Sequence, residues 1–514
     1  MQDLVCRAGV TGRAGLVWTV LLVLTGCGVS AAGKGPSDAS DGDDAEKQAV
    51  AQAPSQVAAA RSAADKRAGE DWPKFLGPQE TGVSRETGLL KTWPVEGPPL
   101  VWSRKIGTGY AAPSVLGNRL VVHHRPRELE IVECLDAATG ETFWKHEYPS
   151  DFEDPYGYNN GSRCAPLLTE TRCYTFGPQG MLICLELETG KVVWEHDTAS
   201  RWKIPTNFFG AGCTPILEGN LLIVLVGGQP DSGVVAFDAE SGKVVWESVG
   251  KKTWDGVEMW NTGRKLKWSD SEKLVSYSSP IVATIHGERH LLCLVRQGLV
   301  SLDPKSGEVR FKYWFRSRLN DSVNAARPVV VDDQIFLTAA YDTGAALLKV
   351  HADSAGYDVV WSNAAGMSCH WSTPIYKDGH VYGFSGRHEQ EAMFQCVELQ
   401  TGKLVWETNG WTRPQDDLDQ DPNSGRIIDA KTKKVIPWPF FGRGSKILVG
   451  DRFIVLGERG TLALVNASSD KFEELARLSA PKLKYPCWAA PVLSRGRLFL
   501  RAEDNLICLD LKAQ

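Results

Sequence analysis

The sequence lacks a long hydrophobic run and an excess of basic residues. Its 514 residues carry a formal net charge of −5. Nucleic-acid-binding proteins present basic patches, so we expect no nucleic-acid partner. No Cys-x-x-Cys-His motif occurs, which excludes a fused c-type haem. A glycine-rich phosphate loop and a nucleophile elbow are also missing, so no ready-made catalytic motif is present.

The N-terminus has the features of an export signal. Arg7 and Arg13 precede a nine-residue apolar run, Leu16–Leu24, which is too short to span a bilayer. A basic start, a short apolar core and small residues predict a secretory signal over residues 1–27. Leu24-Thr-Gly-Cys27 resembles the bacterial lipobox, so we expect Cys27 to carry lipid on the periplasmic side of a membrane. Ordinary secretion with a coincidental cysteine is the alternative.

Residues 28–70 are rich in Ala, Ser, Gly, Asp and Lys. Such a stretch buries too little surface to offset its ordering entropy, so it predicts a flexible tether. The body is then expected to cover residues 71–514.

The body repeats one motif, an acidic residue followed by x-x-Thr/Ser-Gly-x-x-x and an aromatic residue. Copies begin at Asp136, Glu186, Asp238, Asp303 and Glu398, and a degenerate copy begins at Asp353. Repeats at this period predict a propeller, in which Gly gives the hairpin its positive φ and the aromatic ring packs on the next blade. The expected blade-docking residues are Trp102, Trp144, Trp194, Trp246, Phe311, Trp361 and Trp406.

The ends of the repeat array predict how the ring closes. Seven openings of a small residue or Arg plus Pro, and a degenerate one near Ser445, give eight units. The last unit stops at Asp510 without a final strand, whereas Leu100–Ile106 is a strand with no blade before it. We therefore predict an all-β, eight-bladed propeller of four-stranded antiparallel blades, closed by the N-terminal strand. Trp102 should take the place of the eighth outer Trp.

Twelve cysteines in an exported protein would ordinarily indicate disulfides. Cys134, Cys184, Cys396 and Cys508 instead recur in one strand position, which predicts small buried core residues. A second group, for which one bridged pair stays possible, precedes the inner strands: Cys164, Cys213, Cys369 and Cys487.

These repeats resemble the PQQ-like propellers, a superfamily that includes quinoprotein alcohol dehydrogenases and BamB-type outer-membrane assembly lipoproteins. The opening Asp71–Pro78 is also similar to the start of many propeller lipoproteins. The resemblance implies either a BamB-like part in envelope assembly or a PQQ-dependent oxidoreductase for alcohols or sugars, with PQQ and calcium at the channel mouth. Quinoproteins hold the quinone between a Trp and a disulfide of adjacent cysteines, but no two cysteines are adjacent here. We therefore assign no catalytic residue and commit to no cofactor.

Long segments link each outer strand to the next inner strand, and in a propeller they share one face. Loops on a rigid scaffold are the usual place for binding. The residues expected at the channel mouth are Tyr110, Arg163, Tyr277, Arg327, His370, Trp371, Arg443 and Trp488. The three arginines would suit an anionic group; alternatively, each pairs with a neighbouring carboxylate or carbonyl.

Asp417, Asp419 and Asp421 alternate like the ligands of a calcium loop, but Pro422 and Ile428 depart from the EF-hand pattern. A solvated acidic turn is the favoured interpretation, and no metal site is assigned. The favoured function is a non-enzymatic, monomeric scaffold that presents the long-loop face to an envelope protein or polysaccharide. A PQQ-dependent oxidoreductase and a carbohydrate-binding module are the alternatives.

Overall fold

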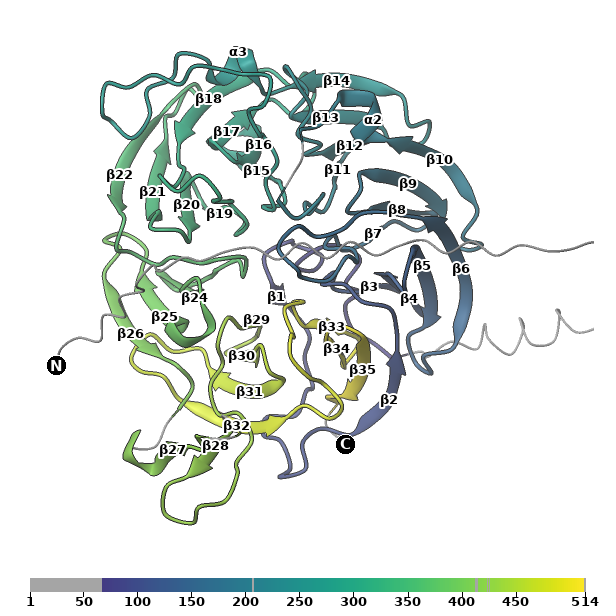
Figure 1. Cartoon of the computed structure of the whole chain (residues 1–514), viewed down its shortest axis with the longest axis vertical. Helices are drawn as coiled ribbons and strands as arrows, with labels where there is room; N and C mark the ends of the chain where they lie inside the picture. The colour runs from purple at the N-terminus through teal and green to yellow at the C-terminus, as the bar shows by residue number, and fades with distance from the viewer. Residues whose placement is uncertain (1–66, 206–207, 412–414, 423, 425, 513–514) are drawn as a thin grey trace, which may run out of the picture. The chain divides into compact units, whose positions relative to one another are not determined.

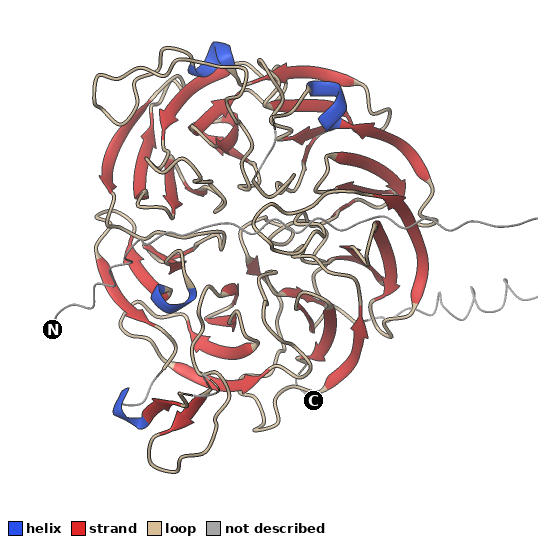
Figure 2. Cartoon of the chain, viewed as in Figure 1, coloured by secondary structure: helices blue, strands red, loops and turns tan. Residues whose placement is uncertain are grey.

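The body of the chain is an eight-bladed β-propeller (Figure 1). The computed structural model describes residues 67–205, 208–411, 415–422, 424 and 426–512. The predicted signal, Cys27 and tether residues 28–66 lie outside these ranges. Strands dominate the described residues, and the only α-helices among them are the short α2 (Thr198–Trp202) and α3 (Lys251–Trp254), shown in Figure 2. The predicted fold class is confirmed.

The strands of the first four blades follow one another in chain order, from the channel outwards, with bounds as follows. Blade 1 holds β3 (Ser114–Leu116), β4 (Arg119–His124), β5 (Leu129–Asp136) and β6 (Thr142–Pro149). Blade 2 holds β7 (Leu167–Leu168), β8 (Arg172–Phe176), β9 (Met181–Glu186) and β10 (Val192–Asp197). Blade 3 holds β11 (Ile216–Glu218), β12 (Leu221–Val224), β13 (Val234–Asp238) and β14 (Val244–Ser248). Blade 4 holds β15 (Ile281–Ile285), β16 (Glu288–Val295), β17 (Gly298–Leu302) and β18 (Val309–Trp314).

The remaining blades continue this order until the last one, which takes its outer strand from the N-terminal side. Blade 5 holds β19 (Val329–Val331), β20 (Gln334–Ala339), β21 (Gly344–Val350) and β22 (Tyr357–Asn363). Blade 6 holds β23 (Ile375–Lys377), β24 (His380–Ser385), β25 (Met393–Glu398) and β26 (Leu404–Thr408). Blade 7 holds β29 (Ser445–Val449), β30 (Arg452–Leu456), β31 (Thr461–Asn466) and β32 (Glu474–Ser479), and β1 (Val83–Ser84) pairs in parallel with β29. Blade 8 holds β33 (Val492–Ser494), β34 (Arg497–Arg501), β35 (Asn505–Asp510) and β2 (Leu100–Lys105).

Insertions occur on the segments that were predicted to be long. A separate two-stranded sheet, β27 (Leu418–Gln420) and β28 (Ile427–Asp429), lies between blades 6 and 7 together with the 3-10 turn η2 (Gln415–Asp417). A second 3-10 turn, η1 (Glu389–Glu391), interrupts blade 6. Within the described residues, no helix is long and apolar enough to cross a bilayer.

The aromatic residue of the repeated motif links seven of the eight blades to the next one; blade 7 carries Ala476 at the equivalent position. Trp144 Nε1 donates to the carbonyl oxygen of Leu187 at 2.9 Å, and its ring covers Gly190, whose φ is +72°. The other motif tryptophans donate to the next blade in the same way, at 2.9 to 3.1 Å. Phe311 has no N–H to donate and packs against Tyr357, with ring centroids 5.3 Å apart. The motif Gly therefore serves both the turn and the neighbouring ring.

The ring closes as the sequence predicts. Strand β2 pairs antiparallel with β35, placing Leu100 opposite Leu509 and Trp102 opposite Cys508; the two strands lie side by side in Figure 1. In blades 1, 2 and 6 the docking Trp also stands opposite a cysteine. These four cysteines are fully buried, which confirms them as core residues. The second group of four is likewise buried and unbridged, and among the ten described cysteines none forms a disulfide.

An N-terminal segment, residues 69–86, crosses the central channel; we name it the strap. Trp72 and Val115 of blade 1 exchange two backbone hydrogen bonds of 2.9 Å. Further bonds bind the strap to Leu168 of blade 2, Leu448 of blade 7 and Ser494 of blade 8. All four partners lie near or at the finishing ends of the innermost strands, so the strap closes that end of the channel. Sequence analysis had assigned the Asp71–Pro78 motif no such role.

Candidate functional site

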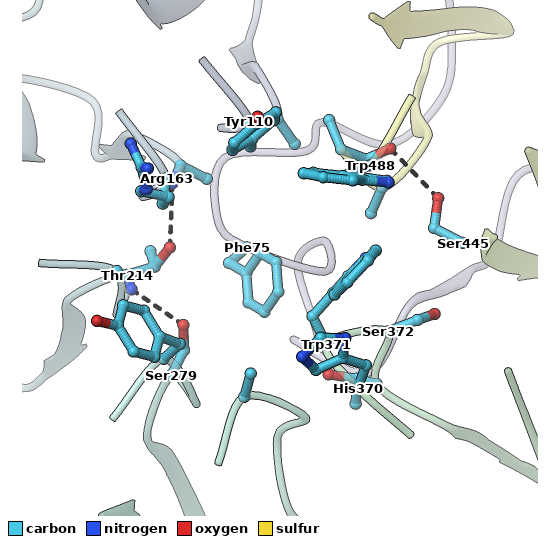
Figure 3. A pocket seen from close by; sticks show the side chains of 18 of the residues that line it. Phe75, Tyr110, Arg163, Thr214, Ser279, His370, Trp371, Ser372, Ser445 and Trp488 are labelled. Atoms are coloured by element: carbon cyan, nitrogen blue, oxygen red, sulfur yellow. Dashed lines mark hydrogen bonds between the residues drawn. The ribbon is translucent and has the colours of Figure 1, made fainter. Parts of the chain in front are cut away.

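A cavity of about 200 Å³ occupies the central channel where the inner strands begin. Phe75 and Leu76 of the strap line it from one side, and loops from several blades form its walls. Figure 3 shows Phe75 in the middle of the ring of lining side chains. Seven of the eight predicted mouth residues line this cavity: Tyr110, Arg163, Tyr277, His370, Trp371, Arg443 and Trp488.

The cavity wall is largely aromatic. The Trp488 ring lies with its centroid 4.7 Å from that of Tyr110 and 5.0 Å from that of Trp371. The Arg443 guanidinium lies 4.9 Å from the Trp371 centroid and 5.0 Å from that of Trp488, within cation–π range. Figure 3 shows Trp371 and Trp488 on the same side of Phe75. Planar apolar groups are what such walls accommodate.

The three predicted arginines are all paired with carboxylates. Arg163 contacts Asp154 at 2.6 Å, and Arg443 contacts Glu458 at 2.7 Å. Arg327 does not line the cavity, because its buried guanidinium holds Glu80 of the strap and the Pro280 carbonyl. The alternative given above, that each arginine has a local partner, describes the structure. These arginines therefore have no free charge for an incoming anion.

His370 and Tyr277 are held as neutral groups. The Tyr341 hydroxyl lies 3.0 Å from His370 Nε2, and burial lowers the pKa of His370 to about 3. The Tyr277 hydroxyl accepts a hydrogen bond from the Phe209 backbone N–H at 2.6 Å, and burial raises its pKa. Both side chains therefore keep one protonation state across the physiological range.

Lys446 is a cavity residue that sequence analysis missed. It lines the cavity and is only 2% exposed. Its ammonium donates to the Thr373 carbonyl at 2.9 Å and lies 5.8 Å from the Phe384 ring centroid. Burial lowers the pKa of Lys446 to about 8. The pairings of β23 and β29 make Ser445 equivalent to Thr373, so Lys446 stands where other units carry Pro; that substitution was the available signal.

The donor set does not fit a calcium-bound quinone. The only carboxylate among the lining residues is that of Asp154, and Arg163 holds it. At the candidate calcium loop, Asp417 pairs with Lys431 at 2.7 Å and Asp419 with Lys433 at 3.4 Å; Asp421 lies beyond β27. No three His, Cys, Asp or Glu side chains gather to suit a metal anywhere in the described residues. Calcium prefers six to eight oxygen ligands, which neither place supplies.

Exposed apolar side chains lie on the segments that link an outer strand to the next inner strand; we name Tyr156, Tyr158, Leu319 and Tyr485 the rim. They are 49%, 43%, 43% and 44% exposed, respectively. The ring centroids of Tyr158 and Tyr485 lie 5.6 and 6.0 Å from that of Trp488. Tyr158 and Tyr485 are therefore continuous with the aromatic wall. Aromatic residues held on a rigid base are typical of protein-binding surfaces.

Comparisons with known proteins match this chain to one family model and to solved structures of similar fold. The family model described as outer membrane protein assembly factor BamB matches residues 128–408, more than half of the chain. BamB from Moraxella catarrhalis is similar in structure, with 14% identity and a TM-score of 0.51 over 81% of this chain and 98% of that one. A quinohemoprotein alcohol dehydrogenase from Comamonas testosteroni has 15% identity and a TM-score of 0.56, over 86% and 81%. At such identities the two structures show a shared fold alone. No curated protein sequence matches this chain.

Proposed function

This chain belongs to the family described as outer membrane protein assembly factor BamB, and on that premise we propose that it is a protein-interaction scaffold of the cell envelope. It acts without catalysis, as a monomer, by presenting its long-loop face to a component of outer-membrane protein assembly. The proposal agrees with the cavity, whose arginines are paired and whose donor set does not suit a calcium-bound quinone.

The rim is the observation that carries the proposal. Its four side chains come from three loops, those between β6 and β7, β18 and β19, and β32 and β33, and they remain between 43% and 49% exposed. Exposed apolar groups cost free energy unless a partner covers them, at roughly 25 cal/mol per Å². Fixed aromatic anchors lose little conformational entropy on binding. A protein partner would therefore gain most of its binding energy there.

Site-specific cross-linking in cells tests this face. A photo-reactive residue replaces Tyr158, Tyr485 or Leu319 in turn, and the matched control replaces Leu404 on an outer strand, which is 43% exposed like Leu319. We expect one cross-linked envelope protein from the three rim positions and none from position 404. Cross-links to that protein from position 404 alone would place the partner on the outer strands and refute the rim.

Membrane attachment through Cys27 is part of the same proposal, since a scaffold for membrane assembly needs to stay at the bilayer. Full-length protein with Cys27→Ser should move from the membrane fraction to the soluble periplasmic fraction. An unchanged distribution would show that lipid on this cysteine does not hold the protein.

The oxidoreductase alternative has its own measurement. Full-length protein incubated with PQQ and Ca²⁺ should show no rise in melting temperature and no dye reduction with alcohols or aldoses. A clear rise together with dye reduction would replace the scaffold by an enzyme.

A further inference from the structure

We propose that the central cavity binds a small aromatic carboxylate, with the Lys446 ammonium as its counter-ion. This ligand site goes beyond the scaffold role and does not depend on it. Three cations line the cavity, namely Arg163, Arg443 and Lys446. Carboxylates pair with the first two, so the inference rests on the third.

Lys446 is buried without a carboxylate partner. It is 2% exposed, and none of the described acidic side chains lies within ion-pair distance of it. Its neighbours are the Thr373 carbonyl, the Phe384 ring and the Cys369 thiol. Buried charges in proteins are otherwise paired or bound to a ligand. The missing anion is therefore the part that a ligand would supply.

The hydrogen bonds of the ammonium are also incomplete. An ammonium group has three N–H donors, and only the bond to Thr373 is made, at 2.9 Å. A second donor, the buried Trp371 Nε1–H, has no partner among the described residues. Trp371 lines the same cavity as Lys446. Buried donors are normally satisfied, and carboxylate oxygens accept hydrogen bonds from both ammonium and indole N–H donors.

The side chains that line the cavity determine the shape and size of the ligand apart from its carboxylate. Phe75, Tyr110, Trp371 and Trp488 provide aromatic faces, which pack well against another flat ring. An apolar cavity of about 150 Å³ is known to hold benzene, so about 200 Å³ accommodates one substituted ring. A single-ring carboxylate meets both the charge and the size requirement.

Binding should weaken at alkaline pH, because only the protonated amine attracts the anion. Among the titratable groups that face Lys446 or the cavity, His370 stays neutral above a pKa of about 3, and burial raises the pKa of Cys369 to about 11. Burial also raises the pKa of Tyr110 and Tyr277. Asp154 pairs with Arg163, and Arg443 pairs with Glu458. Tyr158 is the remaining titratable side chain that lines the cavity. Lys446, whose pKa is lowered to about 8, therefore controls the change between pH 7 and pH 9. Its charged fraction falls about tenfold over that range, and the affinity should fall by about the same factor.

Calorimetric titration of the full-length protein with benzoate, and with neutral benzyl alcohol, tests the site. We expect benzoate to bind at pH 7 and to bind about tenfold more weakly at pH 9. Lys446→Met should lower benzoate affinity at least tenfold while leaving benzyl alcohol affinity unchanged. Lys105→Met serves as the control, since that amine is 75% exposed, and should change neither affinity.

The outcomes separate a ligand site from a structural lysine. Absence of benzoate binding to the wild type at millimolar concentration would overturn the proposal, as would affinity that rises with pH. Equal losses for benzoate and benzyl alcohol in Lys446→Met would also overturn it, since that pattern means cavity collapse. The melting temperature provides a second check: benzoate should raise it for the wild type and not for Lys446→Met.

Discussion

Replacement of Gly190 by Ala tests the contact that joins neighbouring blades. Gly190 has a φ of +72°, and an added Cβ would lie 2.5 Å from Cε3 of the Trp144 ring. Backbone strain and displacement of the indole would therefore act together. Gly219→Ala is the matched control, because its φ is +58° and no atom lies within 4 Å of an added Cβ.

The expected magnitudes differ enough to measure. A left-handed Ala costs about 1–2 kcal/mol at either position. At Gly190 the Trp144 ring, 9% exposed in the wild type, must also move. Its lost burial costs about 1.5–3 kcal/mol, and its hydrogen bond to Leu187 adds about 1 kcal/mol. Gly190→Ala should thus lower the free energy of unfolding by about 3.5–6 kcal/mol, against about 1–2 kcal/mol for Gly219→Ala.

Urea unfolding monitored by circular dichroism gives both values from the midpoint and slope. The same substitution is then made in a Trp144→Ala variant. Because the ring is absent there, Gly190→Ala should lower the free energy of unfolding only by the backbone strain, about 1–2 kcal/mol. If Gly190→Ala and Gly219→Ala cost the same in the wild-type background, the motif glycine serves the turn alone and our account of blade docking is wrong.

Three further outcomes are expected. Trp102→Ala should lower the free energy of unfolding by about 2–4 kcal/mol. It should also speed hydrogen exchange in β35 but not in β17. Equal changes in exchange in both strands would show that the effect is not local to the β2–β35 closure. Burial raises the pKa of Glu133, but hydrogen bonds from His124 and Thr142 and the charges of Arg104 and Lys145 hold it at about 2, below its ordinary 4.5. Its stabilisation, about 3 kcal/mol, is present above pH 4.5 and lost as the pH falls towards 2, so Glu133→Gln should unfold with a weaker acid dependence than the wild type. Arg327→Met should speed hydrogen exchange in residues 74–86 by breaking the bond to Glu80. Arg310→Met, which breaks the pair with Asp303, should leave that segment unchanged.

The repeated parts of this molecule could be predicted from the sequence, because each copy of the motif forms the same contact, in which its aromatic ring packs on the next blade. The spacing from acid to aromatic residue encodes one hairpin and one docking ring, and the six copies of this motif together with the eight strand openings define the ring. The unpaired ends of the array likewise encode the β2–β35 pairing. The placement of seven mouth residues followed from the same logic, since residues just before the inner strands lie near the channel; Arg327 is the exception, because Glu80 of the strap and the Pro280 carbonyl hold its guanidinium.

The strap, the ion pairs of the arginines and the surroundings of Lys446 could not be predicted, because they depend on contacts that the repeat does not encode. The strap occurs once, and nothing in Asp71–Pro78 indicates that Val115 or Leu448 lies opposite it. Asp154 lies on the same loop as Arg163, and Glu458 lies on the loop between β30 and β31; neither acid belongs to the repeated motif, so its pairing with an arginine could not be assigned from the repeat spacing. Lys446 marks a departure from the repeat, and its burial became visible only once Thr373 and Phe384 were placed beside it.

The strap also determines how the ring would bear mechanical load. Tension that enters from the N-terminal side meets the ion pair of Arg67 with Asp510 and then the backbone bonds to blades 1, 2 and 7, before it reaches β2. Those bonds act in different directions around the channel, so the pull is shared among blades instead of peeling one strand. A pull on the N-terminal side of the described chain is therefore spread over several blades before it reaches β2, the strand that closes the ring.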